Sequence, residues 1–237
     1  MDIYGTSMGE LVQGGLPDQL PESPIALFKA WFDQAQSAKD QPNPNAMTIA
    51  TIDPDGRPSA RIVLCKAIHD DPGCLVFHTN YRGRKGKALQ ANPRVSLVFH
   101  WDHEERQVRI EGPATRSPEA ESDAYFAGRR WESRVGAWAS DQSEPIGSRQ
   151  ALIDKLKAVL EEYDVDVEAA ERGEPVHIPR PAHWGGQRVW FERVELWCGA
   201  AGRVHDRAEW TRELTSAEID GAPGYTGGPW SSTRVQP

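Results

Sequence analysis

Short strand-like runs separated by turn residues extend through most of this chain and constrain its fold more than any other feature. Residues 47–52 and 59–67 flank Asp53-Pro54-Asp55-Gly56-Arg57-Pro58, a segment typical of a hairpin loop. Further strands are predicted at residues 74–79, 94–101, 106–115, 187–198, 203–212 and 230–235. Six to eight strands, joined mostly by short loops, predict a mainly β (α+β) fold built as an antiparallel barrel.

Helices are expected only at the edges of this barrel. Ser23-Pro24 is a good helix start, and apolar residues at helical spacing follow it to about residue 39. Other helices are predicted at 83–90, after Ser117-Pro118, and at 151–163. Long helices do not alternate with the strands, so a doubly wound parallel sheet is not expected. Residues 1–20 are interpreted as a flexible arm and residues 21–237 as a single domain.

The distribution of charge predicts a site for a small anion. The chain has 237 residues and a net charge of −8, which argues against nucleic-acid binding because that function leaves a basic footprint. Residues 57–94 nevertheless contain eight basic and two acidic side chains, a local charge of +6. Such a stretch is too short to follow a polymer, so a small anionic ligand is the better interpretation.

Other features exclude several classes of protein. Cys65, Cys74 and Cys198 show no metal-binding or redox spacing, and they are interpreted as free thiols in a reducing compartment, although Cys65 and Cys74 could face each other across a hairpin. Residues 100–105 could hold a metal, but a polar loop between strands is favoured, so no metal is predicted. No apolar run is long enough for a membrane span and no signal pattern opens the chain, so a cytoplasmic protein is expected.

Four clusters of residues carry candidate chemistry. If residues 203–207 form a strand, Arg203, His205 and Arg207 share one face, and a bound anion rather than a neighbouring carboxylate is expected against them. The segment 61–66 has a cation at each end, and alternation places Arg61 and Lys66 on opposite faces unless a bulge intervenes. Taken alone, this segment would be an ordinary barrel strand.

The other two clusters lie at predicted helix ends. His78-Thr79-Asn80 is followed by Arg84-Lys85 at a helix start, where backbone N–H groups and two cations suit a phosphate. A solvated basic loop is the alternative. Tyr125 and Arg129 are four residues apart and share a helix face if the helix continues that far. The alternative is an ordinary helix end.

Taken together, these motifs resemble the pyridoxamine/pyridoxine 5′-phosphate oxidase family, in the family's order. The matching stretches are RIVLCK at 61–66, HTN and GRK within 78–85, ERQV at 105–108, the Tyr125-Arg129-Ser133 trio, GAWASDQS at 136–143, WGGQRV at 184–189 and RVHDR at 203–207. One such motif would be weak, whereas the full ordered set is specific.

The resemblance implies a split β-barrel homodimer with FMN at the subunit interface, residues 184–237 serving dimerisation and substrate binding. The implied activity is oxidation of pyridoxamine or pyridoxine 5′-phosphate to pyridoxal 5′-phosphate by O2, giving H2O2, and ammonia from the amine. FMN would be held by Arg61, Ile62, Val63, Leu64, Lys66, His78, Thr79, Arg84, Lys85, Gln107, Gln142, Ser143, Trp197 and Arg207. The substrate would meet Lys66, Tyr125, Arg129, Ser133, Arg203 and His205, of which Arg203 and His205 would act in catalysis.

The chain departs from the family pattern at several points. Met8-Gly9-Glu10-Leu11 lacks the Arg and Tyr that commonly cover the substrate, and Arg130-Trp131 stands where the family usually has Pro-Arg. Residues 164–172 and 221–229 look longer than usual. Two other functions therefore stay open. One is a related flavin oxidase with another substrate, such as a phenazine-pathway oxidase, and the other is a non-catalytic flavin-binding module.

Overall fold

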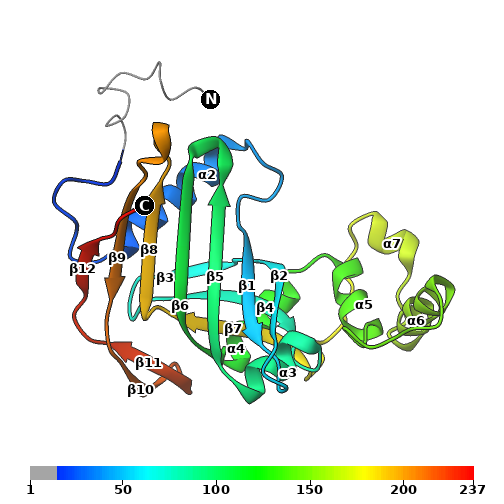
Figure 1. The fold of residues 1–237 in the computed structure, drawn as a ribbon. Helices are drawn as coiled ribbons and strands as arrows, with labels where there is room; N and C mark the ends of the chain where they lie inside the picture. The colour runs from blue at the N-terminus through cyan, green and yellow to red at the C-terminus, as the bar shows by residue number, and fades with distance from the viewer. Residues whose placement is uncertain (1–14) are drawn as a thin grey trace.

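The computed structural model describes residues 15–237, so most of the predicted N-terminal arm, residues 1–14, lies outside the described residues. Antiparallel strands form the body of the molecule, and helices lie around it (Figure 1). The strands are β1 (Ala46–Ile52), β2 (Pro58–Leu64), β3 (Ala67–His69), β4 (Cys74–Asn80), β5 (Arg94–Trp101), β6 (Arg106–Arg116), β7 (Trp184–Trp190), β8 (Arg193–Cys198), β9 (Asp206–Thr211), β10 (Leu214–Ile219), β11 (Ala222–Gly227) and β12 (Ser231–Arg234). The helices of eight residues or more are α2 (Ile25–Ala38), α3 (Arg84–Ala91), α4 (Glu119–Ala127), α5 (Trp131–Ala139) and α6 (Arg149–Glu162).

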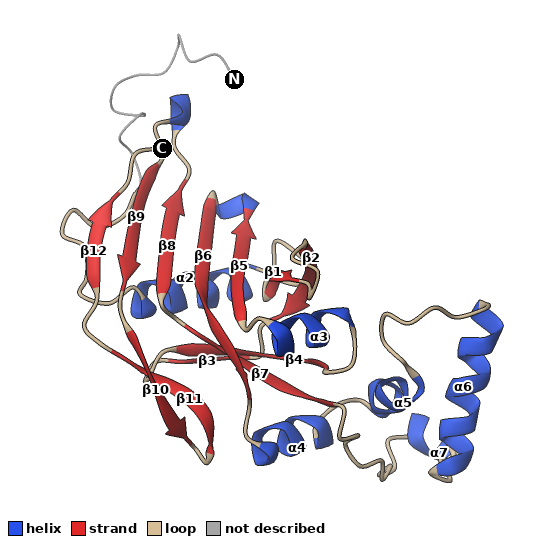
Figure 2. Ribbon diagram, turned by 60° about the horizontal axis from the view of Figure 1, so that its bottom comes forward, coloured by secondary structure: helices blue, strands red, loops and turns tan. Residues whose placement is uncertain are grey.

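Strand β6 joins the two parts of the main sheet. One part has the order β12-β9-β8-β6-β5-β1-β2, and the other is β3-β4-β7 (Figure 2). Residues 106–111 of β6 pair with β8, whereas residues 114–116 pair with β7. Gly112 lies between these two stretches, where an added Cβ would come 1.8 Å from the carbonyl oxygen of Trp190. A glycine is therefore required at the point where the sheet divides, and the result is the predicted split barrel.

The core lies between this sheet and α2. Phe28 and Trp31 are buried on α2, and Phe28 packs on Phe99 and Phe191 with ring centroids 5.4 and 6.2 Å apart. Alternate residues of β5, β6, β8 and β9 fill the same core. The opposite face of these strands is polar, as alternation in a half-buried sheet requires.

The helices α5, α6 and α7 (Val167–Glu171) form a lobe beside the barrel (Figures 1 and 2). The lobe has a small apolar cluster of its own, built on Val135, Val159 and Ile178. Ser148 caps α6 by accepting a hydrogen bond from the N–H of Ala151. The described residues contain no helix with both the length and the apolar composition of a membrane span.

Several predicted boundaries were wrong. The strands expected at 59–67 and 187–198 are each two strands, β2 with β3 and β7 with β8, because the chain passes from one part of the sheet to the other within them. The strand expected from residue 203 begins at Asp206, since Ala201–Arg203 is a 3-10 turn with positive φ at Gly202 and Arg203. Residues 221–229, which look longer than usual for the family, contain the strand β11. Helix α4 ends at Ala127, so Tyr125 and Arg129 do not share a helix face.

Candidate functional site

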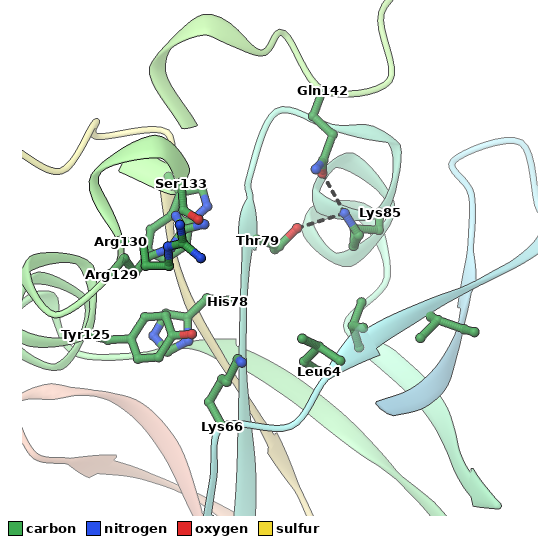
Figure 3. A pocket seen from close by; sticks show the side chains of 13 residues that line it. Leu64, Lys66, His78, Thr79, Lys85, Tyr125, Arg129, Arg130, Ser133 and Gln142 are labelled. Atoms are coloured by element: carbon green, nitrogen blue, oxygen red, sulfur yellow. Dashed lines mark hydrogen bonds between the residues drawn. The ribbon is translucent and has the colours of Figure 1, made fainter. Parts of the chain in front are cut away.

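A cavity of about 510 Å³ opens between β2, β4, α4 and the start of α5. Four of its lining side chains are basic and none is a carboxylate. They are Lys66, Lys85, Arg129 and Arg130, and the remainder of the lining is Ile62, Val63, Leu64, His78, Thr79, Tyr125, Ser133, Gln142 and Trp184. Figure 3 shows Arg129, Arg130 and Ser133 on one side and Lys85 with Gln142 on the other. Within a protein of net charge −8, the lining of this cavity therefore favours an anionic ligand.

Stacked aromatic rings form one wall of the cavity. The His78 ring lies 3.8 Å from the Tyr125 ring at an interplanar angle of 12°, and 5.3 Å from the Trp184 ring at 16°. The Arg129 guanidinium lies over Trp184, 4.5 Å from the ring centroid. Such a wall offers flat apolar and π surface to an aromatic ligand.

His78 and Arg129 carry buried polar atoms that no described residue satisfies. Both ring nitrogens of His78 and Nη1 of Arg129 are buried without a hydrogen-bond partner among residues 15–237. Burial, with the nearby charges of Arg129 and Lys66, lowers the pKa of His78 to about 4, so its imidazole is neutral near pH 7. Unsatisfied buried donors and acceptors are costly, and a bound ligand with polar groups would relieve that cost.

Lys85 is held at the other side of the cavity by two neutral oxygens. Its Nζ donates to Thr79 Oγ1 at 2.8 Å and to Gln142 Oε1 at 2.6 Å. Burial, together with the charge of Arg61, lowers the pKa of Lys85 to about 8. A half-buried ammonium without a carboxylate partner suits a phosphate.

Arg61 and Arg84 do not line this cavity. The guanidinium of Arg61 donates to Thr51 Oγ1 at 2.8 Å and to Ser59 Oγ at 2.5 Å, and burial lowers its pKa. Arg84 binds the buried carboxylate of Asp53, with Nε 2.9 Å from Oδ2. With Ser143 it lines a second hollow of about 440 Å³. The consecutive pairs Arg84-Lys85 and Gln142-Ser143 connect the two hollows.

The remaining predicted site residues form a second group at the β8–β9 end of the sheet. Gln107, Trp197 and Arg207 are cross-strand partners in one row across β6, β8 and β9. The His205 ring lies 4.6 Å from the Trp197 ring, just before β9. Arg203 lies in the preceding turn with φ 63°. The structure thus brings these five residues into one region. Arg203, His205 and Arg207 do not share one strand face, however, because the strand begins only at Asp206.

One expectation about this second group was wrong. Arg207 faces a neighbouring carboxylate, because its Nε and Nη2 lie 3.2 and 3.0 Å from the two oxygens of the buried Glu195. Arg109 binds the same carboxylate at 3.1 Å. Within one chain this group does not line the cavity, since it lies at the end of β8 and β9 away from α4 and α5 (Figures 1 and 2).

Two cavity residues were not assigned to the site from the sequence. Trp184 belongs to a stretch that carried the family resemblance, and its place before Gly185-Gly186 was the available signal. Arg130 was noted only as a departure from the family pattern. The described residues contain no group of three or more potential metal ligands, and their three cysteines are free.

The molecule is thus an antiparallel split-barrel protein with a basic, aromatic-walled cavity, which suits a flat anionic ligand. Residues 34–162 match the family described as pyridoxamine 5′-phosphate oxidase, and residues 184–237 match the pyridoxine 5′-phosphate oxidase C-terminal dimerisation region. The chain belongs to the pyridoxamine 5′-phosphate oxidase family.

Individual relatives agree with this membership. The pyridoxine/pyridoxamine 5′-phosphate oxidase of Gluconobacter oxydans is 47% identical over 92% of this chain and 96% of its own. PhzG from Burkholderia lata, solved in complex with tetrahydrophenazine-1-carboxylic acid, is 28% identical, with a TM-score of 0.78 over 96% of this chain and 100% of its own. A pyridoxamine 5′-phosphate oxidase-related, FMN-binding protein of Nostoc punctiforme shares the fold, with 17% identity and a TM-score of 0.63 over 91% and 98% of the two chains.

Proposed function

We propose that this protein is an FMN-dependent oxidase that converts pyridoxamine or pyridoxine 5′-phosphate to pyridoxal 5′-phosphate, with O2 as acceptor. The observation that carries the proposal is the cavity lined by four basic side chains, no carboxylate and a stacked aromatic wall. Both the cofactor and the substrate would be flat aromatic molecules bearing a phosphate ester. The two basic sides of the cavity allow one phosphate at each.

The residues around Lys85 fit the phosphate of FMN. The half-buried ammonium of Lys85, held by Thr79 and Gln142, has no carboxylate partner, the charge of Arg61 acts on it, and Arg84 and Ser143 line the adjoining hollow. Residues 62–64 and His78 would complete the FMN site on this chain. When bound, FMN would accept a hydride equivalent from the substrate and pass the electrons to O2, giving H2O2.

The residues on the other side of the cavity fit the substrate phosphate. Arg129 has a buried Nη1 without a partner, and Ser133 and Lys66 lie on the same cavity. A guanidinium fork can bind two phosphate oxygens at once, which an ammonium cannot reproduce. Tyr125 would hold the pyridine ring against the aromatic wall. Neutral His78 would add a hydrogen bond without competing for the anion.

The second group of residues is proposed to act in a homodimer. Gln107, Trp197 and Arg207 would complete the FMN site of the partner subunit, and Arg203 and His205 would position the reacting carbon of its substrate. The C-terminal dimerisation region supports this arrangement. The outer face of β2 supports it too, because Ile62, at the cavity, has a 70% exposed side chain that a partner subunit would cover.

A phenazine-pathway oxidase is the second candidate, favoured by the likeness to PhzG, whose solved complex contains a carboxylate ligand. A carboxylate could also bind a guanidinium, so the cavity chemistry suits both ligands in part. The higher identity to the named pyridoxine/pyridoxamine 5′-phosphate oxidase favours the first proposal.

Substrate oxidation by the purified protein distinguishes these functions. The protein should be yellow, with the absorption of bound flavin. Pyridoxamine 5′-phosphate, pyridoxine 5′-phosphate and tetrahydrophenazine-1-carboxylic acid would be supplied separately under air, while aldehyde and peroxide are measured. We expect aldehyde and peroxide from the two B6 esters. Turnover of the phenazine compound alone would reverse the assignment, and bound flavin without any turnover would indicate a non-catalytic flavin-binding protein.

A further inference from the structure

Arg130 lines the cavity beside Arg129 and Ser133, at a position where the family resemblance implies proline. Figure 3 shows its side chain next to that of Arg129 on the same side of the cavity. This chain therefore brings two consecutive guanidiniums to one place. No carboxylate lines the cavity, so a counter-ion of either guanidinium must lie outside it.

The backbone of Arg130 is fixed by the helix that follows. Its carbonyl oxygen accepts hydrogen bonds from the N–H groups of Ser133 at 3.0 Å and Arg134 at 3.2 Å, which close the first turn of α5. The same turn thus positions Arg130 and Ser133 relative to each other. Arg130 has φ −54° and ψ 142°, values that proline also adopts, so the special feature of this residue is its side chain.

The guanidinium of Arg130 is held only by an exposed carboxylate. Its Nη2 lies 2.5 Å from Oε1 of Glu132, and the two side chains are 84% and 43% exposed. The pKa of Glu132 is lowered by this hydrogen bond. An exposed ion pair of this kind contributes little stability, so a more highly charged anion can displace the carboxylate. Glu132 does not line the cavity, so the Arg130 guanidinium must separate from Glu132 before it can bind a ligand in the cavity.

We propose that Arg130 is a second guanidinium for the substrate's phosphate ester and that Glu132 competes with the phosphate for it. This inference rests on the proposed function for the identity of the ester. A phosphate dianion has three terminal oxygens, and the fork of Arg129 can occupy two of them. Arg130 would bind the remaining oxygen and charge. The chain would thereby bind the phosphate ester through two guanidiniums, those of Arg129 and Arg130.

The test compares four forms of the FMN-loaded protein: wild type, Arg130→Pro, Glu132→Gln and the double variant. Calorimetry would measure the dissociation constants of pyridoxal 5′-phosphate, pyridoxal and inorganic phosphate. We expect Arg130→Pro to weaken binding of the phosphate ester about tenfold, the effect of one charge-assisted hydrogen bond. Glu132→Gln should tighten it about twofold, because an exposed competing pair is worth little. The double variant should match Arg130→Pro, and pyridoxal, which lacks the phosphate, should bind all four forms equally.

The lobe offers a matched control. Arg172 forms an exposed pair with Glu174, also two residues apart, with Nη2 3.0 Å from Oε1. Neither residue lines the cavity, so Arg172→Ala and Glu174→Gln should leave all three dissociation constants unchanged. Arg130→Ala, made alongside Arg130→Pro, separates loss of the guanidinium from any effect of the proline ring.

The outcomes test the role of Arg130 separately from the identity of the proposed substrate. If both Arg130 variants bind pyridoxal 5′-phosphate within twofold of wild type, the role of Arg130 is refuted. If Glu132→Gln weakens phosphate binding, the competition is refuted. If wild type does not bind pyridoxal 5′-phosphate but binds inorganic phosphate through Arg130, the proposed substrate fails while Arg130 stands as an anion ligand. If both Arg130 variants bind inorganic phosphate as tightly as wild type, the role of Arg130 as an anion ligand is refuted whatever the substrate is.

Discussion

The residues that line the cavity and the second group of residues, at the end of β8 and β9, differ in how many of their polar atoms have hydrogen-bond partners within the chain. In the cavity, both ring nitrogens of His78 and Nη1 of Arg129 are buried without partners among the described residues. At the end of β8 and β9, Arg207 is held by Glu195 and by the carbonyl oxygen of Gln236. The first group is incomplete without a ligand, whereas the second is already ordered by its own contacts.

This difference suggests separate tasks for the two groups. Lys85 and Arg129 have no carboxylate partner among the described residues, and such cations contribute binding energy because an anion relieves their desolvation. A row of side chains fixed on a sheet face, Gln107, Trp197 and Arg207, contributes position. If each site takes its binding from one subunit and its positioning from the other, neither subunit is active alone.

Mixed dimers should give the largest effect on activity, and they test directly whether the two groups of one site come from different subunits. Arg129→Ala removes a cavity residue, and Arg203→Ala removes a residue of the second group. Each homodimer should be nearly inactive at low substrate concentration. After co-expression, half of the dimers are mixed, and each mixed dimer has one site with both native groups, so about a quarter of the wild-type activity should return. Peroxide production by the purified mixture measures this.

A second pair of variants controls for simple stabilisation in the mixture. Arg129→Ala with Lys66→Ala alters two cavity residues, so no mixed dimer has an intact cavity, and activity should stay at the level of the homodimers. Equal recovery in both mixtures, or none in either, would contradict a site shared between subunits.

Lys85 should give the next largest effect, on FMN affinity. Lys85→Ala removes a half-buried ammonium that no carboxylate neutralises, and we expect FMN to bind about 10- to 100-fold more weakly. Lys29→Ala on α2 is the control, because Lys29 pairs with Asp70 and lines neither the cavity nor the second hollow. Quenching of flavin fluorescence on binding measures both. Equal affinities for the two variants would place the FMN phosphate elsewhere.

The pH dependence of FMN binding sharpens the assignment of Lys85. Burial lowers the pKa of Lys85 to about 8 in the free protein, so the ammonium loses its proton as the pH rises through 8. The phosphate binds the protonated form, so affinity should fall between pH 7.5 and 9.5, by up to about tenfold per pH unit above the pKa. Lys85→Arg should bind FMN without this dependence, since arginine stays charged. If the FMN affinity of Lys85→Arg falls by the same amount over this pH range, the pH dependence belongs to another titratable group.

Much of the barrel was predictable from sequence because strands and their turns are locally encoded. The strand at residues 94–101 was predicted to the residue. The hairpin of β10 and β11 was missed, although Asp220-Gly221 is a strong hairpin signal and both residues adopt positive φ. Helix α5 was missed although Trp131, Val135 and Trp138 recur at helical spacing, and Gly136 lowers its helix propensity.

The site was less predictable because it depends on contacts distant in sequence. The motifs identified most of the cavity residues, but not that Arg84 would bind Asp53 or that Arg207 would bind Glu195. Alternation along residues 203–207 predicted a shared face that the turn at Gly202 and Arg203 abolishes. Such turns depend on how two strand ends meet, and no periodic pattern encodes that.

His78 should show the smallest effect, on stability. Its pKa is about 4 in the folded protein and near 6.5 in the unfolded chain, so between these values only the unfolded chain binds the proton. The folded state therefore loses stability as the pH falls from 7.5 to 5. Because the ring is partly open to solvent, we expect about 1 kcal/mol of additional loss relative to His78→Phe, which keeps a ring against Tyr125 but cannot titrate. Urea unfolding of the FMN-free protein at the two pH values, at one protein concentration, measures the difference. An equal loss in both proteins would mean that His78 already has a polar partner in the free protein, and the contrast between an unsatisfied cavity and a satisfied β8–β9 end would then rest on Arg129 alone.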